Sequence, residues 1–163
     1  MGITFNASEI FEIAEEIERN GAKFYRRAAA NSPDKGTKQM LLNMASMEDG
    51  HLKIFEEMKK QLSGKEKEWA IFDPDNQSAL YLQAMADARG YEGKINPGKE
   101  LTGNETAKEI IEIALNSEKE SVLFYFGLKD MVPVRAGRDK VEIIIREELN
   151  HITTLLKQLK ALT

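Results

Sequence analysis

The chain has 163 residues, of which 42% are hydrophobic and 31% charged, enough to form one globular domain with a buried core. The net charge is −4 with both signs mixed along the chain, which excludes the basic surface typical of proteins that bind nucleic acid or an anionic membrane. The absence of cysteine excludes disulfides, thiolate zinc sites, iron–sulfur clusters and a cysteine nucleophile, so any metal would be held by oxygen and nitrogen.

The first predicted helix covers about residues 7–31. The sequence Asn6-x-x-Glu9 has the pattern of a capping box that opens a helix. Apolar and small residues then recur every three or four positions, as one buried stripe requires. That stripe consists of Ile10, Ile13, Ala14, Ile17, Gly21, Phe24, Tyr25 and Ala28. The turn-forming residues Asn31-Ser32-Pro33-Asp34 end the helical pattern.

A second helix is predicted from about residue 36 to residue 62. Its inner face should carry Met44, Phe55, Met58 and Leu62, and Met40 and Met47 are also expected to fill the core. Residues 63–104 then form a connector with a short helical pattern at 78–88. A connector of about 40 residues is long enough to cross the length of a helical bundle, whereas short loops join antiparallel neighbours.

The third predicted helix, about 105–131, opens with a second capping box, Thr106-x-x-Glu109. Its apolar stripe consists of Ile110, Ile113, Ala114, Val122, Tyr125 and Leu128. Proline and glycine between 132 and 137 end it, and a fourth helix is predicted at 138–162, with Ile144, Leu155 and Leu162 facing inward. The sequence therefore predicts one all-α domain, 1–163, of two helical hairpins, 7–62 and 105–162, joined by the crossover 63–104.

The two hairpins are related by an internal repeat of 100 residues. The segment ASEIFEIA at 7–14 aligns with AKEIIEIA at 107–114, and the alignment continues without a gap. At this shift the following pairs coincide: Glu18 and Glu118, Phe24-Tyr25 and Phe124-Tyr125, Glu48 and Glu148, His51 and His151, and Leu62 and Leu162. Two pseudo-symmetric hairpins are therefore expected.

Both histidines of the chain follow a glutamate by three residues, in Glu48-x-x-His51 and Glu148-x-x-His151, so each pair shares a helix face. Four glutamates have mostly core-type neighbours three and four residues away, whereas Glu12 is surrounded by polar residues. Four buried carboxylates need compensating charge, and two divalent cations would supply it. Carboxylates with neutral imidazoles suit iron or manganese. The predicted ligands are Glu18, Glu48, His51, Glu118, Glu148 and His151.

Other interpretations apply to single residues of this set. Either histidine alone would more often be a core residue bonded to a carboxylate, but a registered pair with two added glutamates favours a metal site. Tyr25 and Tyr125, each seven residues after a predicted ligand, are expected to pack in the core with their hydroxyls bonded to a ligand glutamate, rather than to carry radicals. Asp49, Glu147 and Asn150 are expected to be solvated. No catalytic residue apart from the ligands is predicted.

With these residues on four helices, the chain resembles the ferritin-like di-iron carboxylate proteins, and the ferritin-like domain of rubrerythrin in particular. The resemblance covers roughly 7–31, 36–62, 105–131 and 138–162. It implies a ferritin-like four-helix bundle with a long crossover connection and a cofactor of two iron ions, for which manganese or zinc are candidate substitutes.

Three departures from this family are visible. Ser121 stands where rubrerythrins carry a further glutamate that takes part in shifting one iron between redox states. Without cysteine there is no rubredoxin domain, so electrons would come from a separate donor protein. The sequence stops at Thr163, where storage ferritins have a short fifth helix that helps to build their cage, which disfavours cage-type storage.

The resemblance implies reduction of hydrogen peroxide or dioxygen at a carboxylate-bridged two-metal site. The alternatives are an iron-binding, sensing, ferroxidase or iron-handling module without catalytic turnover, or oxygenation of an organic substrate. No nucleic-acid or membrane partner is expected, and a homodimer is. No apolar run approaches the roughly 20 residues of a membrane span, and the opening residues lack a signal-peptide pattern, so the expected location is the cytoplasm.

Overall fold

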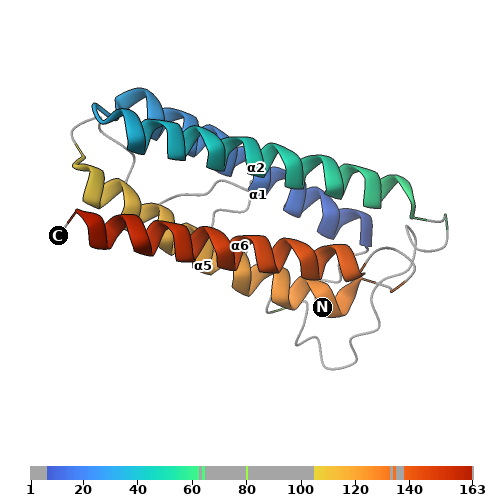
Figure 1. Ribbon diagram of the computed structural model, residues 1–163. Helices are drawn as coiled ribbons and strands as arrows, with labels where there is room; N and C mark the ends of the chain where they lie inside the picture. The colour runs from blue at the N-terminus through green and yellow to red at the C-terminus, as the bar shows by residue number, and fades with distance from the viewer. Residues whose placement is uncertain are drawn as a thin grey trace.

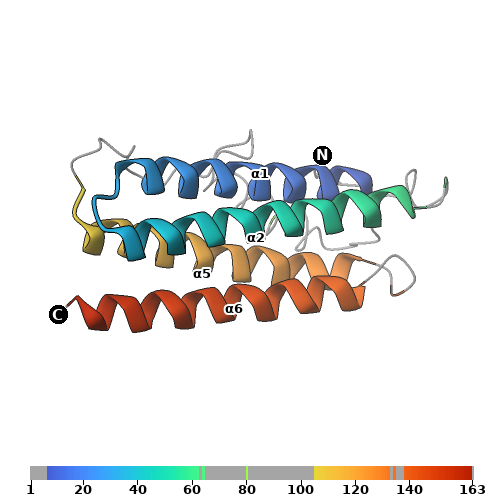
Figure 2. The same cartoon turned by 45° about the horizontal axis from the view of Figure 1, so that its top comes forward.

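The computed structural model describes residues 7–62, 64, 80, 105–132, 134 and 138–162. These residues form four long helices: α1 (Ala7–Asn31), α2 (Lys35–Lys60), α5 (Ala107–Met131) and α6 (Arg138–Ala161). No strand occurs in these ranges. The four helices run side by side along one axis, as Figures 1 and 2 show from two directions. The predicted all-α fold and the four predicted helices are confirmed.

Helix caps fix where α2 and α5 begin. Asp34 caps α2, because its carboxylate accepts a hydrogen bond from the backbone N–H of Thr37 at 2.6 Å. Thr106 and Glu109 form the predicted capping box of α5, in which each side chain accepts a hydrogen bond from the other residue's backbone N–H. The corresponding box at Asn6 and the helical pattern at 78–88, apart from Leu80, lie outside the described residues.

The direction of the helices accounts for the length of the crossover. Within each hairpin the two helices are antiparallel, and α2 ends at the opposite end of the bundle from the start of α5 (Figure 1). The two helix ends that are joined by 63–104 therefore lie at opposite ends of the bundle, as a crossover connection requires. Across the seam between the hairpins, α1 contacts α5 and α2 contacts α6.

The apolar core is divided into two clusters. One draws on the first halves of α1 and α6 and the second halves of α2 and α5, and includes Phe11, Phe55 and Phe124. The other draws on the remaining halves and includes Phe24 and Leu41. Burying a large apolar side chain stabilises the fold by roughly 1.5–3 kcal/mol, so each cluster can hold its end of the bundle. What lies between them at mid-helix is polar.

Two apolar positions differ from the prediction. Met47 is 38% exposed rather than buried, because it precedes the inward-facing Glu48 by one residue and so lies about 100° round the helix from it. Leu162 is 49% exposed although its repeat counterpart Leu62 is buried, since Leu162 lies beyond the end of α6 and joins neither core cluster. None of the helices in the described ranges is long and apolar enough to cross a membrane.

Candidate metal centre

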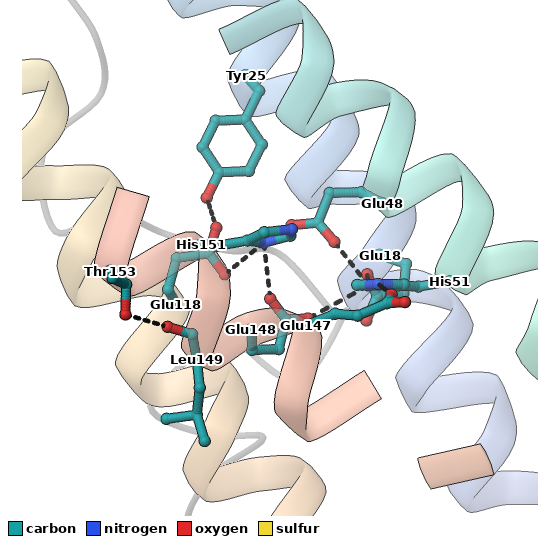
Figure 3. A network of polar contacts seen from close by, with 10 residues as sticks. All are labelled: Glu18, Tyr25, Glu48, His51, Glu118, Glu147, Glu148, Leu149, His151 and Thr153. Carbon is teal, nitrogen blue, oxygen red and sulfur yellow. Dashed lines mark hydrogen bonds and ion pairs between the residues drawn. The ribbon is translucent and has the colours of Figure 1, made fainter. Parts of the chain in front are cut away.

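The polar layer between the two clusters consists of the six residues predicted as ligands. Each helix supplies one glutamate near its middle, and the E-x-x-H spacing on α2 and α6 adds a histidine one turn later. All six side chains are buried, with at most 5% of each residue exposed, and they point toward one another (Figure 3). The six are Glu18 on α1, Glu48 and His51 on α2, Glu118 on α5, and Glu148 and His151 on α6.

One group of four donors surrounds His51. Its Nδ1 atom lies 3.4 Å from Oε2 of Glu18, 3.2 Å from Oε2 of Glu48 and 3.3 Å from Oε1 of Glu148. One ligand atom from each of these four residues lies within 4.8 Å of all the others, which is the spacing of donors that share a metal ion. We call this group the His51 position.

A second group surrounds His151. Its Nδ1 atom lies 3.4 Å from Oε2 of Glu118 and 3.1 Å from Oε2 of Glu148. Glu48 completes a second set of four donors within the same 4.8 Å limit. We call this group the His151 position. Glu48 and Glu148, which come from opposite hairpins, belong to both groups, so the arrangement offers two adjacent positions with two shared carboxylates.

Unpaired polar atoms indicate that the cluster is built to hold something. Seven buried side-chain atoms of these six residues have no hydrogen-bond partner among the described residues, including Nδ1 of both histidines and one oxygen of each glutamate. Leaving such an atom unpaired costs about 1–3 kcal/mol. Because several of these atoms face one another, shared cations would satisfy them together. The donor set of oxygen and imidazole nitrogen fits iron or manganese.

A small residue beside the cluster leaves room for these donors. A Cβ atom added at Gly21 on α1 would lie 3.3 Å from Oε1 of Glu48, which is tighter than ordinary van der Waals contact. The absence of a side chain at Gly21 therefore gives the shared carboxylate of Glu48 its place. At Gly50, by contrast, an added Cβ would meet nothing within 4 Å, so this glycine between Glu48 and His51 has no packing role visible in the described residues.

The carboxylates of α1 and α5 are hard to ionise in the absence of metal. Burial, together with the neighbouring carboxylate of Glu48, raises the pKa of Glu18 well above its usual range. Burial and the neighbouring carboxylate of Glu148 raise the pKa of Glu118 to about 8. Both shifts reflect like charges crowded into a site from which water is excluded.

The pKa values of the two imidazoles are raised as well, which favours the charged form of the rings. Burial acts to lower the pKa of His151, but its contacts with Glu118 and Glu148 outweigh burial and raise the pKa to about 10. Burial also acts to lower the pKa of His51, but the close carboxylates of Glu148, Glu18 and Glu48 outweigh burial and raise it. In the metal-free protein, protons on these rings therefore take the place of metal charge.

The two tyrosines lie on opposite sides of the polar layer, Tyr25 in one apolar cluster and Tyr125 in the other. The hydroxyl of Tyr25 donates a hydrogen bond to Oε1 of Glu118, a glutamate of the other hairpin (Figure 3). The hydroxyl of Tyr125 is buried and has no hydrogen-bond partner in the part of the chain that the structure describes. The expected contact to a predicted ligand therefore occurs for Tyr25 and is absent for Tyr125.

Sequence reasoning missed the role of Glu147. This residue was expected to be solvated, but its Oε2 lies 2.7 Å from Nε2 of His51, although 40% of its side chain remains exposed. An ionised carboxylate can only accept, so Nε2–H of His51 donates this bond. A signal was present in the repeat, because position 147 is glutamate where position 47 is methionine. Asp49 pairs with Arg26 at the surface and Asn150 is exposed.

Comparisons with known proteins agree with this geometry. The family model described as Rubrerythrin matches residues 9–159. Among solved structures, the chain is similar to a protein of Thermotoga maritima proposed to be a ferritin-like diiron-carboxylate protein. The two share 26% identity over 98% of each chain, with a TM-score of 0.72. No curated protein matches the sequence.

Proposed function

The chain belongs to the rubrerythrin family, and on that premise we propose that it is a redox protein that reduces hydrogen peroxide or dioxygen at a two-iron centre. The family and the carboxylate–histidine cluster together indicate iron binding. The observation that supports the redox proposal is the pair of adjacent four-donor groups that share Glu48 and Glu148. Two metal ions held by donor groups that share ligands could act on one small oxidant together.

The six buried glutamates and histidines would hold the two ions. Glu18 and His51 would hold one ion, Glu118 and His151 the other, and Glu48 and Glu148 would contact both. Bound ferrous ions would supply two electrons, so that hydrogen peroxide and two protons become two molecules of water while both ions become ferric. The four carboxylates balance the cationic charge, and the two core clusters on either side restrict access of bulk water.

Electrons for further turnover would come from outside the chain. The 163 residues contain no cysteine with which to bind an iron–sulfur or rubredoxin-type iron centre. A separate electron-donor protein is therefore part of the proposal. Restoring both ions to the ferrous state requires two electrons for each molecule of peroxide reduced.

A second candidate function is ferroxidase or iron handling, in which iron is oxidised without peroxidase turnover. The observation that favours it is Ser121, which is buried on α5, one turn after Glu118, and replaces the further glutamate of rubrerythrins. A serine hydroxyl is a weaker iron donor than a carboxylate and brings no charge to follow a change of iron oxidation state.

One experiment separates these functions. The metal-free protein is loaded with ferrous iron under anaerobic conditions, iron per chain is counted, and hydrogen peroxide or dioxygen is added while the near-ultraviolet absorbance of the diferric product is followed. Two iron ions per chain, faster oxidation by peroxide than by dioxygen, and repeated reduction by an added donor support the peroxidase. Oxidation without repeated turnover supports iron handling. Fewer than two ions, or no loss of iron in the double variant His51→Ala, His151→Ala, contradicts a two-iron centre at these residues.

A further inference from the structure

The two histidines of the centre differ in the hydrogen bonding of Nε2, the ring nitrogen other than the Nδ1 that faces the carboxylates. Nε2 of His51 donates to Glu147 at 2.7 Å. Nε2 of His151 is buried and has no hydrogen-bond partner among the residues that the structure describes. The repeat explains the difference, because the position equivalent to Glu147 is occupied by Met47, whose thioether carries no charge and no strong acceptor.

A carboxylate that accepts the Nε2 proton of a histidine determines the tautomer of the ring and the donor strength of Nδ1. Because Glu147 accepts the Nε2 proton, the neutral ring of His51 is held in the tautomer whose lone pair is on Nδ1, the atom that faces Glu18, Glu48 and Glu148. The negative charge also makes the ring a stronger donor, and the bond fixes its orientation. His151 has neither advantage.

A second contact, independent of the first, also makes the donors at the His151 position weaker than those at the His51 position. The hydroxyl of Tyr25 donates to Oε1 of Glu118 at the His151 position, whereas Oε1 of Glu18 at the His51 position has no hydrogen-bond partner in the described ranges. A hydroxyl that donates to one oxygen of a carboxylate stabilises the negative charge, and so makes the other oxygen, here Oε2 that faces His151, a weaker donor to a metal ion. Glu118 is therefore the weaker donor of the two.

We propose that Glu147 and Tyr25 make the two metal positions inequivalent, so that the His51 position binds a divalent metal first and more tightly than the His151 position. Glu147 acts through His51 and is a positioning residue. This inference rests on the proposed function only in requiring that the cluster bind two metal ions, and it makes no use of the redox reaction.

The test is a titration of the metal-free full chain with Co²⁺, followed by calorimetry and by the visible absorbance of the bound ion. We expect two binding steps of different affinity in the unchanged protein. Glu147→Gln keeps a hydrogen-bond acceptor but removes the charge, and should weaken the tight step by about 10- to 100-fold, the usual effect of losing such a partner, while the weak step stays within about twofold. His51→Ala should abolish the tight step, and His151→Ala the weak one.

Two further variants make the test specific. Met47→Glu introduces a carboxylate at the position that the repeat relates to Glu147, and should tighten the weak step. Glu142→Gln removes a carboxylate from the exposed face of the same helix, where it pairs with Arg146 at 3.2 Å, and should change neither step. Circular dichroism of each metal-free variant shows whether the helices are retained.

The outcomes are distinguishable. Two equal steps in the unchanged protein, or equal weakening of both steps by Glu147→Gln, would overturn the inequivalence and leave the two-metal proposal standing. Retention of the tight step in His51→Ala would overturn the assignment of that step to the His51 position. A chain that binds no Co²⁺ at all would overturn the proposed function together with this inference.

Discussion

The rings of His51 and His151 lie almost parallel, with their centroids 5.9 Å apart and their planes inclined by 15°. The two residues come from opposite hairpins and are 100 positions apart, so they meet only because α2 and α6 lie side by side at mid-helix. Nδ1 of His51 faces Glu18, Glu48 and Glu148, and Nδ1 of His151 faces Glu118 and Glu148, so the two rings share Glu148.

Gly21→Ala should weaken metal binding without unfolding the protein. The added Cβ would lie 3.3 Å from Oε1 of Glu48, so the shared carboxylate must move and both metal positions should lose affinity, by about tenfold or more. Gly50→Ala is the matched control, because its Cβ meets nothing within 4 Å and alanine favours a helix by about 1 kcal/mol over glycine. The control should unfold at higher denaturant concentration and bind metal normally. A loss of metal in Gly50→Ala would give this glycine a role in the centre.

Removing a shared carboxylate should affect both positions, whereas removing an unshared one should affect one. Glu48 belongs to both donor groups and Glu18 to only one. After anaerobic loading with ferrous iron, Glu18→Gln should retain about one ion per chain and Glu48→Gln fewer, since both ions lose a charged ligand. Elemental analysis of desalted protein provides the measurement. Equal retention by the two variants would show that Glu48 is not shared.

The two tyrosines should respond differently to removal of the hydroxyl. Tyr25→Phe leaves the buried oxygen of Glu118 without its donor, and should lower the free energy of unfolding of the metal-free protein by about 1–3 kcal/mol. Tyr125→Phe removes a buried hydroxyl that has no partner in the described residues, so the free energy of unfolding should be unchanged or higher. Urea denaturation compares the two. A larger loss in Tyr125→Phe would contradict the assignment of the hydrogen bond.

The metal-free protein should lose stability as the pH rises above neutrality. The folded state raises the pKa of Glu118 from 4.5 to about 8 and that of His151 from 6.5 to about 10. Between each pair of values the folded chain binds more protons than the unfolded chain, so the free energy of unfolding falls with increasing pH. Both groups contribute between pH 6.5 and about 8, where the fall should be steepest.

Metal should reverse this dependence. Bound cations replace the protons on the imidazoles and carboxylates, so metal affinity rises with pH and the loaded protein gains stability where the metal-free protein loses it. Urea denaturation at pH 6, 7, 8 and 9, with and without Co²⁺, checks both signs. A metal-free protein that becomes more stable over this range would show that the cluster is not held together by protons.

The helices and the inward residues were predictable from sequence because both depend on a fixed local period. Residues three and four positions away decided that Glu18 and Glu118 face inward, and the structure buries both. The capping box at Thr106 is also a local pattern, readable from four consecutive residues. The repeat then indicated that the two halves would bring equivalent side chains to one place.

Contacts across the seam could not be predicted in this way. Whether Glu147 reaches His51, and whether Tyr25 meets Glu118 rather than Glu18, depends on how one hairpin is rotated and shifted against the other. No local period encodes that rotation, because it results from the packing of two apolar clusters. The prediction for Met47 was wrong for a different reason: Glu48 faces inward, so the local helix period already directs the preceding residue away from the core.

The repeat also limits how a centre of this kind can acquire two different halves. A single hairpin carrying Glu18, Glu48 and His51 could pair with an identical copy and form the same set of six donors. Such a symmetric dimer would place the same residue beside both imidazoles, whatever that residue was. When the two halves are parts of one polypeptide, position 147 can be glutamate while position 47 is methionine. Covalent joining of the hairpins thus permits the symmetry of the centre to be broken by a single codon.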